Sequence, residues 1–171
     1  MARSLFTFPN PVNDVAARTV ATGVVVMAVV AVAARLPWLT VPLAYGFVAR
    51  VLSGPRLSPL GQLATRLVAP RLARHVKLVP GPPKRFAQAI GAAFTLGALA
   101  LWLAGHATGA YVLLAVLAVP AFLEAALGYC VGCQVFALAM RVGLVPASVC
   151  EECADIWGPA ATARRAARST N

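Results

Sequence analysis

Acidic residues are scarce in this composition. The 171 residues include only five Asp or Glu, charged residues make up 12%, and hydrophobic residues make up 60%. A chain with so few polar side chains cannot cover its apolar surface in water, which excludes an ordinary soluble domain. We therefore expect lipid to surround most of the chain.

Several recognisable motifs are missing as well. The first apolar run begins late, is long and lacks a clear small-residue cleavage site, so we expect no signal peptide. No nucleotide, haem, flavin or nucleic-acid motif accompanies the formal net charge of +10. Because the Lys and Arg residues flank apolar runs, we assign this charge to membrane topology and anionic lipid, and we expect no nucleic-acid partner.

Four apolar segments fit membrane-spanning helices, which need about 20 residues to cross a core of about 30 Å. The sequence predicts spans at about 15–34, 36–52, 86–104 and 110–129. The second is the weakest, since Pro42 interrupts it and Arg50 lies near its end. Arg50 can snorkel to the interface, and a re-entrant segment is the alternative. The expected fold is an all-α, four-helix transmembrane bundle.

A basic segment separates the second and third spans. Ser58 and Pro59 resemble an N-cap and first helical position, and the apolar face that follows predicts a surface helix at about 58–69 that Pro70 ends. The segment carries eight cations and no acid: Arg50, Arg56, Arg66, Arg71, Arg74, Lys77, Lys84 and Arg85. The opposite loops carry only Arg35 and His106, so the positive-inside rule places both termini and this segment in the cytoplasm.

Two acids lie at or inside the predicted spans. Asp14 and Arg18 are four residues apart, so we expect them to pair on the first turn of a helix. Glu124 is the one acid inside a span, which makes it a functional candidate. On a continuous helix Glu124 would point away from Cys130 and Cys133. We therefore expect Glu124 to pair with a polar group on another span.

All four cysteines occur in two C-x-x-C pairs, Cys130–Cys133 and Cys150–Cys153, separated by sixteen residues. The predicted topology places them on the cytoplasmic side, where permanent disulfides are rare. The spacing falls within the zinc-ribbon range, although the apolar residues between the pairs lack polar turns. Residues 134–149 are expected to form a helix at the membrane surface, with a fifth span as the alternative.

Charge distinguishes the two cysteine pairs. The second pair has acidic neighbours, which disfavour thiolates unless a metal or a cationic partner compensates. These neighbours are Glu151, Glu152 and Asp155. If spans three and four form a hairpin, Lys84 and Arg85 come level with Cys130, where they would stabilise a thiolate or bind an anion. Anchoring at the membrane surface is the alternative role for Lys84 and Arg85.

Four stretches carry a family resemblance: FPNPVNDVAAR (8–18), RLSPLGQLA (56–64), GPPKRFAQAIG (81–91) and LEAALGYCVGC (123–133). The chain resembles, from about residue 8 to residue 153, the bacterial integral-membrane family called domain of unknown function four-three-nine-five. The family name carries no activity. The resemblance implies a small bacterial membrane protein, often encoded near thioredoxin-like or rhodanese-like sulfurtransferase proteins.

The sequence therefore predicts one membrane domain at 1–153, with a cysteine segment at 130–153, and a basic tail at 154–171 that is a frayed helix or disordered. Our first hypothesis is thiol–disulfide exchange or sulfur relay in the bacterial inner membrane. Cys130 or Cys133 would be the nucleophile, and Cys150 and Cys153 a second pair.

Three alternatives remain open. The first is a non-enzymatic module that binds Zn or Fe through all four cysteines. The second is a set of inert thiols, and the third is an oligomeric transporter of a small sulfur anion.

Overall fold

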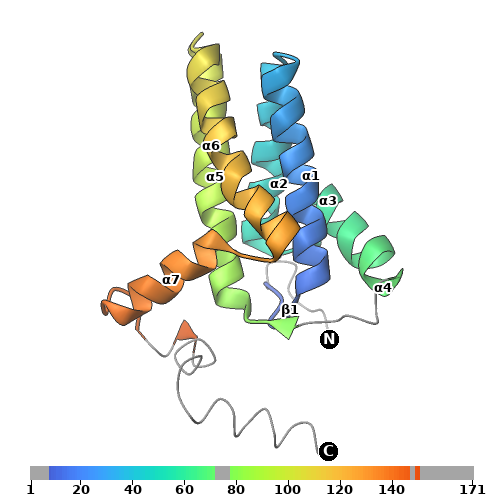
Figure 1. Ribbon diagram of the computed structural model, residues 1–171, viewed down its shortest axis with the longest axis vertical. Coiled ribbons are helices and arrows are strands. Elements are labelled where there is room, and N and C mark those ends of the chain that lie inside the picture. The colour runs from blue at the N-terminus through green and yellow to red at the C-terminus, as the bar shows by residue number, and fades with distance from the viewer. Residues whose placement is uncertain (1–7, 72–77, 147–148, 151–171) are drawn as a thin grey trace, which may run out of the picture.

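The computed structural model describes residues 8–71, 78–146 and 149–150 (Figure 1). Three helices in this part of the chain are long and apolar enough to cross a bilayer: α1 (Asp14–Ala33), α5 (Gly81–Leu103) and α6 (Ala107–Leu127). They match the first, third and fourth predicted spans to within a few residues. The chain is thus a multi-pass membrane protein with an all-helical fold.

The second predicted span, 36–52, is helical over nearly its expected range, but only part of it is α-helix. A 3₁₀ turn (Pro37–Leu39) leads into α2 (Thr40–Ser53), which has 14 residues and a length of about 21 Å. Pro42 does not interrupt α2, because it lies in the first turn, where backbone N–H groups have no intrahelical partner. By itself α2 does not reach across a hydrocarbon core of about 30 Å.

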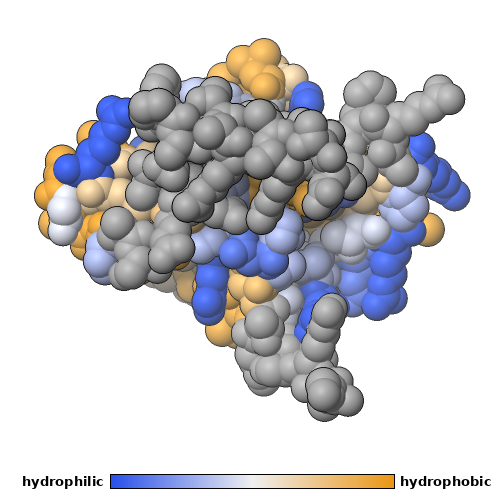
Figure 2. Space-filling model, turned by 90° about the horizontal axis from the view of Figure 1, so that it is seen from below, coloured by the Kyte–Doolittle hydropathy of each residue, from blue (hydrophilic) through white to orange (hydrophobic). Residues whose placement is uncertain are grey.

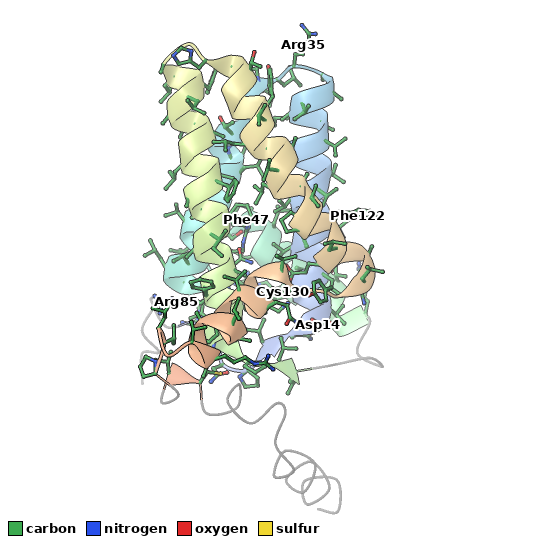
Figure 3. All side chains as sticks on the ribbon, turned by 60° about the vertical axis from the view of Figure 1, so that its left-hand side comes forward. Asp14, Arg35, Phe47, Arg85, Phe122 and Cys130 are labelled. Atoms are coloured by element: carbon green, nitrogen blue, oxygen red, sulfur yellow. The ribbon has the colours of Figure 1, made fainter. Side chains whose placement is uncertain are left out.

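The four helices form a bundle in which α1 packs on α6, α2 packs on α5, and α5 packs on α6 (Figure 1). Small residues occupy much of the interior, since Ala28, Ala31, Ala98 and Ala110 are fully buried. Small side chains let neighbouring backbones approach closely, as is usual between membrane helices. Arg35 lies at one end of the bundle, and Asp14 and Cys130 lie towards the other (Figure 3).

The surface helix extends past its predicted end. It comprises α3 (Pro59–Leu63), a π-helical turn (Ala64–Val68) and α4 (Ala69–Arg71), so it includes Pro70. The wider turn before the proline accommodates its missing donor. Ala64 is buried and Leu60 packs against α1 at Gly23, while Leu63 and Leu67 remain exposed. One part of the apolar face therefore packs inside the protein, partly against α1, and the other part is exposed.

The end of the bundle that carries Cys130 also holds a short antiparallel ladder, β1 (Val12–Asn13) with β2 (Leu78–Val79), and helix α7 (Val131–Arg141). The surface helix predicted at 134–149 thus begins and ends earlier. Viewed from this end, hydrophilic patches alternate with apolar ones (Figure 2). The predicted tail at 154–171 and the predicted loop cations Arg74 and Lys77 lie outside the described residues.

Candidate functional site

The first cysteine pair starts a new helix instead of continuing α6. Gly128 has a φ of 67° and caps α6 in the left-handed conformation, with its N–H bonded to the Glu124 carbonyl. Cys130 has an extended backbone and is the N-cap of α7. The prediction of a continuous helix through the cysteines is wrong, because the left-handed glycine turns the chain. The expectation that Glu124 points away from the thiols, which assumed a continuous helix, therefore does not apply.

Cys130 and Cys133 form a hydrogen-bonded pair in the first turn of α7. Both are free, Cys130 being buried and Cys133 partly exposed. The hydrogen bond donated by Cys133 lowers the pKa of Cys130, and the positive charge of Lys84 acts in the same direction, whereas burial and Glu124 oppose it. The same hydrogen bond and burial raise the pKa of Cys133. These opposite shifts favour the thiolate of Cys130 over that of Cys133.

Lys84 connects all three long helices near these thiols. Its Nζ lies 2.5 Å from Oε1 of Glu124 on α6 and 3.7 Å from Oδ1 of Asp14 on α1, and its side chain is 6% exposed. Glu124 thus pairs with a polar group on another span, as its position inside an apolar helix predicted. The site therefore contains two carboxylates, one ammonium and two thiols, all at one end of the bundle.

Asp14 does not pair with Arg18 as the sequence predicted. Arg18 instead donates to the carbonyls of Ala125 and Ala126 at 2.9–3.2 Å. Those carbonyls belong to the last turn of α6, where they lack intrahelical partners and carry the negative end of the helix dipole. Asp14 is left to interact with Lys84.

Arg85 points away from the thiols. It is exposed, and its Nε donates to the carbonyl of Val51 at 3.0 Å. The first N–H of α5, at Gly81, is already bonded to Oδ1 of Asn10 at 2.9 Å. Of the two predicted cations, therefore, only Lys84 lies in the site, and one donor of the expected anion site is occupied.

Arg50 is buried in the bundle instead of snorkelling to the interface. Its Nε donates to Oε1 of Gln88 at 2.8 Å and its Nη1 to Oγ of Ser58 at 3.1 Å. The guanidinium lies over the ring of Phe47, 4.5 Å from the centroid. These partners explain why a cation is retained inside the bundle. Its Nη2 is buried and has no hydrogen-bond partner among the described residues.

A cavity of about 550 Å³ lies between α1, α2, α5, α6 and α7. Most of its lining side chains are apolar. The polar and charged side chains in its lining are Arg50, Gln88, Glu124 and Cys130. The cavity therefore joins the buried arginine to the thiol site, although the two lie far apart in the sequence.

Sequence reasoning missed Asp14, Gln88 and Ser58 as members of this region and misplaced Arg50. A usable signal was present for two of them. Arg50 and Gln88 are polar residues within apolar runs, and such residues usually face a partner inside a bundle.

The second cysteine pair is only partly described. Cys150 is buried next to Phe136 of α7 and is disulfide-bonded, which differs from the expectation of four reduced thiols. Cys153 and the acidic residues Glu151, Glu152 and Asp155 lie outside the described ranges. Within those ranges no group of three or more His, Cys, Asp or Glu residues is placed to hold a metal ion. The four-cysteine Zn or Fe site needs Cys153, and it stays a prediction.

The sequence profile of the family described as domain of unknown function (DUF4395) matches residues 12–141. This range contains Asp14, Lys84, Glu124, Cys130 and Cys133, and it ends before Cys150. Comparisons with curated proteins and with solved structures found no match. Because the match covers most of its length, the chain belongs to the DUF4395 family.

Proposed function

We propose that this chain is a membrane dithiol protein in which Cys130 and Cys133 carry out thiol–disulfide exchange or sulfur relay. The partner would be a soluble thioredoxin-like or rhodanese-like protein. The observation that carries the proposal is a free, hydrogen-bonded C-x-x-C pair at the start of a helix, close to Lys84. A thiolate at a helix N-terminus beside a cation is the usual setting of a reactive cysteine.

The two cysteines have different roles in this proposal. The Cys130 thiolate attacks a partner disulfide, forms a mixed disulfide and releases one partner thiol. Cys133 then attacks the Cys130 sulfur, so that the second partner thiol leaves and a Cys130–Cys133 disulfide remains. In a relay, Cys130 would instead take a sulfane sulfur from a partner persulfide. Cys133 is partly exposed, which gives partner thiols a route to the oxidised pair.

Lys84 acts as a positioning residue in this scheme. Its charge favours the thiolate of Cys130. Asp14 and Glu124 hold the ammonium in place, and the negative charge of Glu124 opposes its effect on Cys130. Arg85, which binds the Val51 carbonyl, has no direct role.

The topology we propose has both termini at the cytoplasmic face of the bacterial inner membrane. In this topology, α2 and the preceding 3₁₀ turn bring the chain back to the cytoplasmic face and complete a four-helix bundle. The distribution of charge supports this orientation, since Arg66, Arg71 and Arg85 follow α2 while Arg35 and His106 lie in the opposite turns. Cys150, which packs beside α7, would then exchange with the same cytoplasmic partner.

The experiment measures exchange with thioredoxin on the purified full chain. Cys133→Ser should trap a mixed disulfide through Cys130, and Cys130→Ser should abolish trapping. Ala137→Ser, on the same helix α7, is the matched control and should exchange like the unmodified protein. If both cysteine variants exchange at the unmodified rate, the proposal is wrong.

A further inference from the structure

We propose that the cavity beside Cys130 binds a lipid-soluble quinone that accepts the two electrons of the Cys130–Cys133 dithiol. This inference rests on the proposed dithiol function and names the oxidant that such a function requires.

The size and lining of the cavity fit a small apolar ligand. A volume of about 550 Å³ lies within the usual range of about 300–1,000 Å³ for ligand pockets. Two of its lining residues on the span α6, Val116 and Val119, are also exposed on the outside of the bundle. Exposed faces of apolar spans meet lipid, so a membrane-soluble ligand can enter without passing through water.

One donor of the Arg50 guanidinium, Nη2, lacks a hydrogen-bond acceptor among the described residues. The residue is 5% exposed, and two of its nitrogens bind Gln88 and Ser58. The third, Nη2, has no acceptor among the described residues, although Arg50 lines the cavity. Buried donors are nearly always bonded, so the ligand that completes this site carries a hydrogen-bond acceptor.

Charge decides which acceptor fits. Among the residues that line the cavity, Arg50 supplies one positive charge and Glu124 supplies one negative charge. The charges of the lining are therefore balanced when Cys130 is a neutral thiol. A carboxylate ligand would add an unpaired negative charge, whereas a carbonyl oxygen accepts from Nη2 without changing the balance.

The thiols decide which carbonyl compound fits. Cys130 lines the cavity, and Cys133 does not. The Cys130 thiolate adds to a ring carbon of the quinone and forms a C–S bond. Cys133 then attacks the Cys130 sulfur, the S–S bond forms, and the C–S bond breaks with its electron pair going to the ring. The two thiol protons end on the two oxygens, giving one disulfide and one quinol.

The probe is decylubiquinone, added to the full chain in nanodiscs without oxygen. We expect one quinone to bind per chain and to be reduced as the Cys130 and Cys133 thiols are lost. Ala121→Phe fills the cavity and should weaken binding at least tenfold, and Arg50→Lys, which lacks the Nη2 donor, should do the same. Ala115→Phe, at an exposed position of the same helix that is not part of the cavity lining, is the matched control.

Decylbenzene, which lacks carbonyls, should bind at least tenfold more weakly than decylubiquinone. Equal binding of the two compounds would mean that the cavity takes only apolar chains, such as lipid tails, and would overturn the inference. Absence of binding, binding without reduction, or unchanged binding by Ala121→Phe would overturn it too. Exchange with thioredoxin, measured without quinone on the same samples, tests the dithiol function separately: if exchange persists while quinone reduction fails, only the quinone inference falls.

Discussion

Lys84 on α5 and Glu124 in the last turn of α6 form a buried ion pair, with Nζ and Oε1 2.5 Å apart. Asp14 on α1 approaches the same ammonium at 3.7 Å. The ion pair thus joins the three long helices at the end where α7 and the thiols begin. Breaking this ion pair should lower the stability of the bundle and change the reactivity of Cys130.

Replacing Lys84 by Met should destabilise the protein, because two carboxylates with little solvent contact lose their cation. Breaking a buried pair by removing one partner typically costs about 3–5 kcal/mol. The melting temperature in detergent measures this loss. Lys84→Met combined with Glu124→Gln should recover part of it, since fewer unpaired charges remain. A single variant as stable as the unmodified protein would contradict a structural role for the pair.

The pH dependence of alkylation should separate the two thiols. The hydrogen bond from Cys133 lowers the pKa of Cys130, so Cys130 should react with iodoacetamide at lower pH than an ordinary cysteine. In Cys133→Ala this donor is lost, the pKa of Cys130 should rise, and its alkylation curve should move to higher pH. Mass spectrometry of the labelled peptide follows the change. A curve that moves to lower pH would refute this assignment.

Gly128 should tolerate Asn better than Ala. Its φ of 67° lies in the left-handed region, which costs an L-residue such as Ala about 1–2 kcal/mol and which Asn adopts more readily. Gly128→Ala should lower the melting temperature and slow Cys130 alkylation by disturbing the turn that places Cys130. Gly128→Asn should change both quantities less. Equal effects of the two substitutions would show that the turn conformation is not what matters.

Gly132→Ala should push α7 away from α5. A Cβ at Gly132 would lie 2.5 Å from Cβ of Ala87, and overpacking of this kind typically costs about 1–3 kcal/mol. Gly109→Ala is the matched control, because its Cβ would meet only the flexible end of Leu101 at 3.1 Å. Thermal unfolding compares the two variants. If Gly109→Ala is the more destabilising substitution, the close contact of α7 with α5 does not determine the stability of the protein.

The proposed orientation predicts opposite labelling of the two ends of the bundle. In a chain without the native cysteines, Ala104→Cys lies in the turn between α5 and α6, and Arg66→Cys lies on the surface helix. A membrane-impermeant maleimide should label Ala104→Cys in spheroplasts, and Arg66→Cys only after lysis. The reverse labelling pattern would show that the chain has the opposite orientation in the membrane.

The long helices could be read from the sequence because their determinants are local. Uninterrupted apolar runs of about 20 residues indicate a span whatever their neighbours are, and α1, α5 and α6 match such runs. The C-x-x-C pair and the lone acid at Glu124 were equally visible. The effect of Pro42 was misjudged, because a proline in the first turn of a helix and a proline that breaks a helix look alike without the backbone.

What the sequence determined by itself was the membrane class, the three long spans and the chemical groups that make the site. Only the tertiary structure decided their partners. Lys84 and Glu124 are 40 residues apart, and Arg50 and Gln88 are 38 apart. No local pattern specifies contacts at such separations, since they depend on which helices pack together and on how deeply each charge is buried. The left-handed turn at Gly128 likewise brought Cys130 to the cavity, because it redirected a chain whose apolar sequence alone reads as continuous helix.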